Sequence, residues 1–300
     1  MAFLVTSGTK ALIQGMTGKE GQRALGWMRA AGTEVLAGVT PGKGGQEVGG
    51  VPVFDSVAEA TVAFPQINAT TLYVPPRFVL SAFREAAQAD IPLIHIFAEN
   101  VPVKDTAEMI ELSGQKNIRV VGPSSVGVFS PGVGRLGTAG GGDESNFLAP
   151  SGVGGVAIIS KSGGMIPTLA FPLTQAGIAQ TTVVGIGGDS LVGSTYADLL
   201  DLIAADGQTK ALFIIGEIGG SYEEQLAEAI IQTHFAKPVV ALITGLFAQT
   251  LPQGSTFGHA GAIVSRTEGT REGKIKALQR AGVTILDDAS QVARVVGEVL

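Results

Sequence analysis

The sequence contains no cysteine among its 300 residues, which excludes disulfide bonds, thiolate metal sites and cysteine nucleophiles. Charged residues are scarce, at 15%, and the net charge of −6 leaves no basic surface for nucleic acid. No apolar run approaches the roughly 20 residues that span a bilayer, and no secretory signal is visible at the N-terminus. These absences predict a soluble protein of the cytoplasm or an organelle matrix, with no membrane or nucleic acid partner.

Glycine, by contrast, is abundant: the 43 glycines are about twice the average usage. They lie mostly between apolar runs rather than in one tract, and 45% of the residues are hydrophobic, which is typical of a folded chain. A length of 300 residues is enough for two domains with a core each.

Short β-branched runs alternate with helical patterns along the chain, as in parallel sheets covered by helices on both faces. In the first part we expect strands near 11–14, 34–39, 70–74, 93–97 and 119–121, and helices near 19–31, 56–63, 77–89 and 104–113. This order is Rossmann-like and defines a first domain over residues 1–128.

The pattern lapses over residues 129–154, where a stretch rich in glycine, proline and serine predicts a connection between domains. Beyond it we expect strands near 156–160, 182–186, 211–215, 239–243 and 283–286, and helices near 165–176, 195–205, 222–233, 271–281 and 289–300. The second domain, residues 155–300, is therefore predicted to be a flavodoxin-like doubly wound sheet, and the fold class is α/β throughout.

The first glycine loop, QGMTGKEG at 14–21, opens the first helix directly after the first strand. Its spacing is GxxGxxG, not the GxGxxG of dinucleotide enzymes, yet its N–H groups and the helix dipole favour a phosphate. After the second strand, the acidic residue that would hold a ribose hydroxyl is missing, and Lys43 stands between glycines. A lysine there suits an additional phosphate and favours coenzyme A over NAD. The alternative is a tight turn that only packs a helix on its strand.

Three further glycine loops follow strands of the second part. The sequence SKSGGM at 160–165 leads into a helix and is an expected anion site, although no triphosphate loop of the form GxxxxGK[ST] occurs in the chain. The other two loops are GIGGD at 185–189 and GEIGG at 216–220.

One histidine, in STFGHAGA at 255–262, has almost no side-chain bulk around it. Imidazole is a nucleophile at neutral pH, and the flanking glycines let a bulky anion approach. We therefore expect His259 to react, with Glu217 orienting one nitrogen of its ring. Alternatively, His259 makes only a local hydrogen bond and Glu217 only caps a helix. We interpret His95 and His234 as structural, expect Lys274 only to solvate a helix face, and expect no metal site in this chain.

Six motifs, taken in order, resemble the α subunit of succinate–CoA ligase and its family of nucleotide-dependent acid–CoA ligases. They are QGMTGKEG at 14–21, GVTPGKGG at 38–45, VPVF at 51–54, GIGGD at 185–189, GEIGG at 216–220 and GHAGA at 258–262. The resemblance spans nearly the whole chain and implies a CoA-binding domain followed by a ligase domain.

By this resemblance, His259 is phosphorylated during turnover with the help of Glu217, and Ser162, Gly163 and Gly164 receive the phosphoryl group and the acid. The residues that would hold coenzyme A are Thr17, Gly18, Lys19, Glu20, Lys43, Pro75, Phe97, Ala98 and Glu99. The implied cycle passes the phosphoryl group from ATP or GTP through His259 to a carboxylic acid, whose acyl phosphate the CoA thiol attacks. The nucleotide and Mg²⁺ would bind to a β subunit with an ATP-grasp fold, in a heterodimer or heterotetramer.

Some sequences depart from succinate ligases. Their second loop usually continues Ser-Gly-Thr-Leu-Thr-Tyr, with the tyrosine lining the acid pocket, whereas this chain has SGGMIP at 162–167. Their Gly-Pro-Asn-Cys-Pro-Gly is GPSSVG at 122–127 here. These sequences, with GTAGG at 137–141 and Phe257, look closer to ATP-citrate lyase and the small subunit of citryl-CoA synthetase. Loss of the tyrosine would make room for a larger and more charged acid, so we predict citrate, with succinate as the alternative.

Two other classes share part of this pattern. An NAD-dependent oxidoreductase would explain the first sheet and the glycine loops, but not a second sheet with His259. A non-catalytic CoA-responsive binding protein would share the first half and would never take up phosphate.

Overall fold

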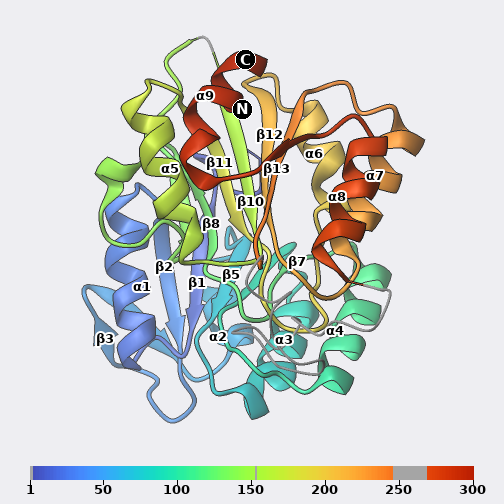
Figure 1. The fold of residues 1–300 in the computed structure, drawn as a ribbon. Helices are drawn as coiled ribbons and strands as arrows, with labels where there is room; N and C mark the ends of the chain where they lie inside the picture. Colours follow the sequence, from blue (N-terminus) through green and yellow to red (C-terminus); the bar gives the residue numbers. More distant parts are fainter. Residues whose placement is uncertain (1–2, 153, 246–268) are drawn as a thin grey trace.

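Two seven-stranded sheets organise the computed structural model, which describes residues 3–152, 154–245 and 269–300. In Figure 1 the first half of the chain, in blue to cyan, lies below the second half, in green to red. The α/β class predicted from the sequence is confirmed.

The first sheet has the strand order β3-β4-β2-β1-β5-β6-β7. Its strands are β1 (Lys10–Gln14), β2 (Glu34–Val39), β3 (Glu47–Val48), β4 (Val51–Phe54), β5 (Ala69–Leu72), β6 (Leu93–Ile96) and β7 (Arg119–Val121). All neighbours pair in parallel except β3, which pairs antiparallel with β4 at the edge. Without β3, this is the Rossmann order 3-2-1-4-5-6, whose switch point falls between β1 and β5. The short strands β3 and β4 were not expected.

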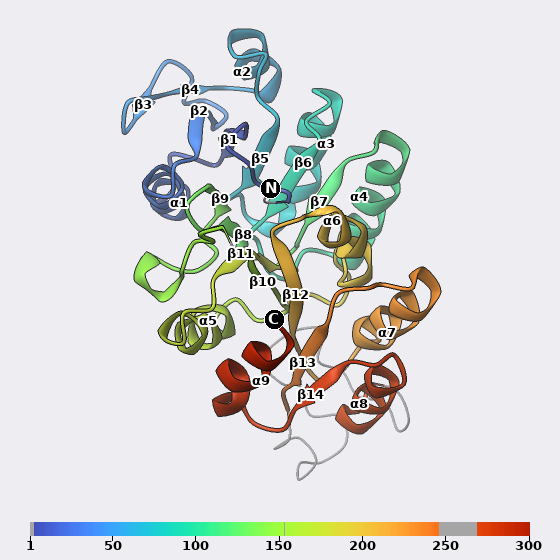
Figure 2. The ribbon, with the colours of Figure 1, turned by 90° about the horizontal axis from the view of Figure 1, so that it is seen from above.

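Helices cover both faces of this sheet (Figure 2). They are α1 (Lys19–Ala30) on one face, and α2 (Val57–Ala63), α3 (Val79–Gln88) and α4 (Val103–Lys116) on the other. Residues of β1 alternate between the two layers: Ala11 and Ile13 join the cluster that includes α1, and Leu12 joins the cluster of α2 to α4. The sheet is therefore buried on both sides, which explains its nearly continuous apolar strands.

The second sheet has the order β14-β13-β12-β10-β11-β8-β9. Its strands are β8 (Gly127–Ser130), β9 (Gly134–Gly137), β10 (Gly155–Ser160), β11 (Gln180–Gly185), β12 (Thr209–Gly216), β13 (Val239–Ile243) and β14 (Thr284–Leu286). The strands β10 to β14 are parallel and follow the order 2-1-3-4-5 of flavodoxin-like sheets, with the switch point between β10 and β12. The predicted topology of this half is confirmed.

Two layers of helices also cover the second sheet (Figure 2). One contains α5 (Met165–Gln175) and α9 (Val292–Val299), and the other contains α6 (Leu200–Ala205), α7 (Tyr222–Thr233) and α8 (Arg271–Arg280). Short 3₁₀ helices at Pro76–Phe78, Glu144–Asn146, Ala197–Leu199 and Ala289–Gln291 complete the description. Among the described residues, no helix combines the length and the apolar character needed to cross a bilayer.

The hairpin of β8 and β9 differs from the sequence analysis, which expected an irregular connection from 129 onward. Both strands are antiparallel additions to the second sheet, β8 on β11 and β9 on β8. The hairpin also reaches the first half, since the Thr33 hydroxyl donates to the Arg135 carbonyl and accepts its N–H, both at 2.7 Å. Glycines hide this strand pattern because Gly127 and Gly137 adopt positive φ angles of 99° and 94°. One apolar cluster consequently continues through both halves.

Candidate active site

The loops after β1, β2, β5 and β6 meet at the C-terminal edge of the first sheet, around its switch point. Every residue predicted to hold coenzyme A lies in one of these loops or in the first turn of α1. Thr17 and Gly18 follow β1, with Lys19 and Glu20 opening α1; Lys43 follows β2, Pro75 follows β5, and Phe97, Ala98 and Glu99 follow β6. The fold therefore brings residues from four separate segments to one edge, with Lys43 exposed.

The first glycine loop is shaped by close backbone approach. Gly15 has a φ of 80°, and a side chain there would overlap the Tyr73 carbonyl. A Cβ at Gly21 would lie 2.5 Å from the Gly15 carbonyl oxygen. Gly18 caps α1 without a side-chain hydrogen bond, which suits a helix start that receives a phosphate. These contacts account for the GxxGxxG spacing, because two of its three glycines tolerate no side chain.

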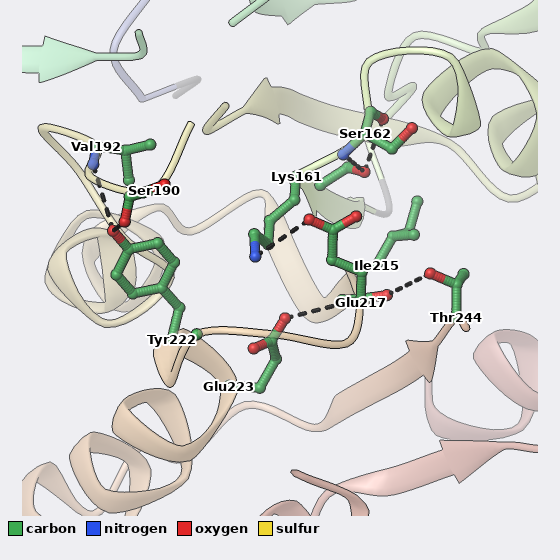
Figure 3. Close-up of polar contacts among 12 residues, drawn as sticks. Lys161, Ser162, Ser190, Val192, Ile215, Glu217, Tyr222, Glu223 and Thr244 are labelled. Carbon is green, nitrogen blue, oxygen red and sulfur yellow. Dashed lines mark hydrogen bonds and ion pairs between the residues drawn. The ribbon is translucent and has the colours of Figure 1, made fainter. Parts of the chain in front are cut away.

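A second cluster lies at the switch point of the second sheet (Figure 3). Strands β10 and β12 are neighbours, with Ser160 opposite Ile215. The chain continues from β10 into the loop that opens α5, and from β12 into Glu217. As a result, the Nζ atom of Lys161 lies 3.2 Å from Oε1 of Glu217, and their side chains are only 2% and 13% exposed. An ion pair removed from water in this way is costly to break.

Lys161 was missed by the sequence analysis, which treated SKSGGM only as an anion loop. The available signal was its place at the end of one strand while Glu217 ends the neighbouring one. Its ammonium also lies 5.5 Å from the ring centroid of Tyr222. The Tyr222 hydroxyl donates to the Ser190 carbonyl and accepts the Val192 N–H, both at 3.3 Å. Burial raises the pKa of Tyr222, so the hydroxyl keeps its proton.

The backbone of Glu217 is held by a second buried ion pair. Its N–H donates to Oε1 of Glu223 at 3.1 Å, and the other oxygen of Glu223 pairs with Lys274. Both of these side chains are 0% exposed. Lys274 also donates to the Gly220 carbonyl at 2.9 Å and to Glu224 at 3.0 Å. The expectation that Lys274 only solvates a helix face is wrong, because α8 packs its side chain against α7.

His259 lies within residues 246–268, outside the described residues, and so does Phe257. The described residues on either side of that segment both bond to the GEIGG loop. Thr244 donates its N–H and its hydroxyl to the Gly216 carbonyl at 2.9 and 3.0 Å. The Gly219 N–H donates to the Gly269 carbonyl at 2.8 Å. The described residues that precede and follow this segment therefore both lie beside the loop that carries Glu217.

The two sequences that depart from succinate ligases are in contact. A side chain at Gly163 would overlap Val126, which also packs against Gly185. The Ser160 hydroxyl accepts the Ser162 N–H at 3.0 Å and donates to its carbonyl at 2.8 Å, which fixes the start of the loop. Changes at 122–127 and at 162–167 thus alter one region of the molecule, next to the start of α5.

The structural interpretation of His95 is confirmed. His95 is buried, with Nδ1 2.6 Å from the Thr71 hydroxyl and Nε2 2.9 Å from the Ser125 carbonyl. Burial lowers the pKa of His95 to about 4, so the ring is neutral at pH 7. His234 ends α7 in the left-handed conformation, with a φ of 51°. In the part of the chain that the structure describes, no group of three His, Asp or Glu side chains could hold a metal ion.

Comparison with known proteins agrees with this arrangement. Residues 6–100 match the family of CoA binding domains, and residues 159–299 match the CoA-ligase family. A CoA-binding domain followed by a CoA-ligase domain defines this chain as part of an acid–thiol ligase.

The chain is 42% identical over 300 residues to subunit alpha 2 of the ADP-forming succinate–CoA ligase of Archaeoglobus fulgidus, covering 100% of both chains. It belongs to the family of α subunits of ADP-forming acid–CoA ligases. It is also 36% identical over 298 residues to a subunit of an ADP-forming sulfoacetate–CoA ligase from an Acholeplasma species, covering 99% of this chain and 98% of that one. The resemblance predicted from the six motifs is confirmed.

Among solved structures, the chain is similar to the ATP citrate lyase of Methanosaeta concilii in complex with (3S)-citryl-CoA. The TM-score is 0.89 at 26% sequence identity, over 99% of this chain. The chain spans 50% of the length of that protein. The two-sheet fold is therefore shared with a larger enzyme that was solved with a CoA thioester.

Proposed function

We propose that this chain is the α-type subunit of a nucleotide-dependent acid–CoA ligase that works through a phosphohistidine at His259 and an acyl phosphate. The observation that carries the proposal is the bonding of Thr244 and Gly269 to the loop of Glu217. These residues lie on either side of the segment that contains His259, and both bond to the loop that carries Glu217.

The reaction has three steps. A ring nitrogen of His259 attacks the γ-phosphorus of ATP or GTP, and the bond to the bridging oxygen breaks, releasing the nucleoside diphosphate. A carboxylate oxygen of the acid then attacks the phosphorus, and the histidine leaves. Finally, the CoA thiol loses its proton and attacks the acyl carbon, and phosphate departs. The nucleotide and Mg²⁺ bind to a β subunit with an ATP-grasp fold, which associates with this chain as a heterodimer or heterotetramer.

In the phosphorylation step, Glu217 orients the imidazole. A carboxylate that accepts a hydrogen bond from one ring nitrogen leaves the other as the nucleophile. Lys161 pairs with the Glu217 carboxylate at 3.2 Å, and Glu223 accepts the backbone N–H of Glu217 at 3.1 Å. Ser162, Gly163 and Gly164 precede α5, whose start lacks a side-chain cap and can receive the phosphoryl group or the acid.

Coenzyme A binds to the edge of the first sheet in this proposal. The residues that hold it are Thr17, Gly18, Lys19, Glu20, Lys43, Pro75, Phe97, Ala98 and Glu99. The CoA-binding domain comprises residues 1–128 and the ligase domain residues 155–300, with 129–154 between them. The positive charge of exposed Lys43 suits a phosphate of CoA.

Two acids are candidates. Succinate is supported by the full-length relative at 42% identity. Citrate is supported by Val126, at which the chain departs from succinate ligases and which contacts Gly163, next to the departure at Gly164, and by the likeness to ATP citrate lyase. We place succinate first, because the identity to that relative is higher, and keep citrate as the second candidate.

The test uses the complex of this chain with its β subunit and ATP labelled at the γ-phosphate. We expect the label on this chain, labile in acid and stable in base, as for a phosphohistidine. CoA with succinate should discharge the label and yield a thioester. Discharge by citrate and not by succinate would reverse the order of the two acids. A complex that binds CoA and acid but never takes up label would refute the proposal.

Replacing Lys161 by methionine in this complex is expected to lower kcat by about 10- to 100-fold, because Glu217 loses the cation beside it. Lys161→Arg keeps the charge and should retain most of the activity. A methionine variant with the wild-type rate would exclude this role.

A further inference from the structure

The GIGGD sequence at 185–189 has no role in the reaction described above, yet it lies at the interface between the two halves. Gly187 has a φ of 111°, and a side chain there would overlap the Pro123 carbonyl. The next N–H, of Gly188, donates to the Ser124 carbonyl at 3.3 Å. The glycines of this motif therefore permit a close approach between backbones, which brings Asp189 against the first half.

Asp189 reaches across this interface with both carboxylate oxygens. Oδ1 accepts the N–H of Asn100 and Oδ2 accepts the N–H of Val101, each at 3.1 Å. Asp189 is only 6% exposed. Hydrogen bonds from neutral N–H groups to an ionised, buried acceptor are stronger than those between neutral partners. Two successive backbone N–H groups of the first half are thus bound by one carboxylate of the second half.

The residues bound in this way end the loop after β6, which also contains Phe97, Ala98 and Glu99. The Ala98 carbonyl accepts the Ser124 N–H at 2.8 Å, and Ser124 in turn accepts Gly188. The far end of the loop adopts an unusual conformation, with a φ of 58° at Asn100. The second half therefore holds this loop directly through the carboxylate of Asp189 and indirectly through Ser124 of the first half.

We propose that Asp189 is a positioning residue that holds the loop after β6 in the conformation that binds coenzyme A. The inference rests on the proposed function, in which Phe97, Ala98 and Glu99 contact CoA. With the carboxylate in place, the loop is ordered before CoA arrives, so binding does not have to order it. Through Asp189, the half of the molecule that carries Glu217 determines how tightly the other half binds CoA.

The segment that follows Asp189 also contacts the cluster around Glu217. Ser190 and Val192 bond to the Tyr222 hydroxyl, and the Tyr222 ring lies 5.5 Å from the Lys161 ammonium (Figure 3). The same short segment therefore touches the CoA loop on one side and the phosphoryl-transfer site on the other. This arrangement keeps the two sites in a fixed relation.

The test is Asp189→Asn in the complex with the β subunit. Asparagine has a similar shape but accepts only one of the two N–H groups and turns its own amide N–H₂ toward the other. We expect the KM for CoA to rise about 10- to 100-fold, the range for loss of a hydrogen bond to a charged group. Phosphorylation of His259 by ATP and the KM for the acid should not change, because CoA takes no part in those steps.

Asp198→Asn is the matched control. One oxygen of the exposed Asp198 carboxylate accepts the Thr195 N–H at 2.8 Å and the Thr195 hydroxyl at 2.7 Å, so it caps a local turn within the second half and makes no bond to the described residues of the first. This variant should keep the wild-type KM for CoA. An Asp189→Asn variant with an unchanged KM, or one that loses phosphorylation as much as CoA affinity, would overturn the inference. A wild-type complex that takes up no label would instead refute the proposed function.

A measurement on the unaltered complex covers the case in which the variant does not fold. The amide hydrogens of Asn100 and Val101 should exchange slowly with solvent even without CoA, because the carboxylate binds both. Fast exchange that slows only when CoA is added would show that CoA orders the loop, and the inference would then fail.

Discussion

Replacing His259 by alanine is expected to abolish the uptake of labelled phosphate and to lower the rate of thioester formation by about 10⁴-fold or more. Alanine keeps the small size of the loop residues but offers no nucleophile. Without His259, the acid has to attack the nucleotide directly, and no covalent intermediate divides the reaction into two easier steps. The measurement is label retained on this chain after mixing with ATP and the β subunit, together with the rate of thioester formation.

The other two histidines supply the controls. His234 is exposed in a left-handed conformation that asparagine also adopts readily, so His234→Asn should take up label normally. His95 is buried and bonds through both ring nitrogens, which leaves no nitrogen for a phosphoryl group. Label that persists in His259→Ala, or label that is stable in acid, would place the intermediate on another residue or deny it altogether.

The fold was predictable because its dominant signal is local. Strands such as β10 and β12 are buried on both faces and read as continuous apolar runs, and glycine loops mark their ends. The strands that were missed, β3, β4, β8 and β9, have two to four residues each, and all of them except β3 contain glycine or proline. Such short strands are stabilised by pairing with neighbours, which a single sequence does not display.

The site was predictable only in part. Glu217 and the loop before α5 follow neighbouring strands, so their common edge follows from the strand order. Lys161 could not be predicted from the sequence, because a lysine in a glycine loop is usually solvated. Its ion pair with Glu217 becomes strong only because the fold buries it, and the sequence does not show that burial. Lys274 is similar: its burial depends on how α7 and α8 pack, and the helix sequence REGKIKALQR reads as polar.

The two glutamate–lysine pairs share one consequence for function. Lys161 holds the side chain of Glu217, and Lys274 holds Glu223, which accepts the Glu217 N–H. The carboxylate is thus fixed from two directions by buried cations on different elements. In the proposed reaction, this geometry holds the carboxylate that orients His259 in place, so it does not have to rearrange.

Replacing Lys274 by methionine is expected to lower the free energy of unfolding by about 3–5 kcal/mol, because it leaves the carboxylate of Glu223 buried without its cation. Glu224 also loses a partner, but its side chain is 30% exposed and stays in contact with water. The loss should lower the thermal midpoint by roughly 10 °C. Turnover should also fall, because the N–H of Glu217 depends on the position of Glu223.

Two controls separate a buried charge from a general defect. Arg294→Met removes an ion pair to Glu298 on the surface of α9, with side chains 62% and 59% exposed, and should cost less than about 0.5 kcal/mol. The double variant Glu223→Gln with Lys274→Met removes the charge and keeps an oxygen for the Glu217 N–H, so it should recover most of the stability. If Lys274→Met unfolds at the wild-type temperature, Glu223 is not held as an ion, and the support that we assign to Glu217 fails with it.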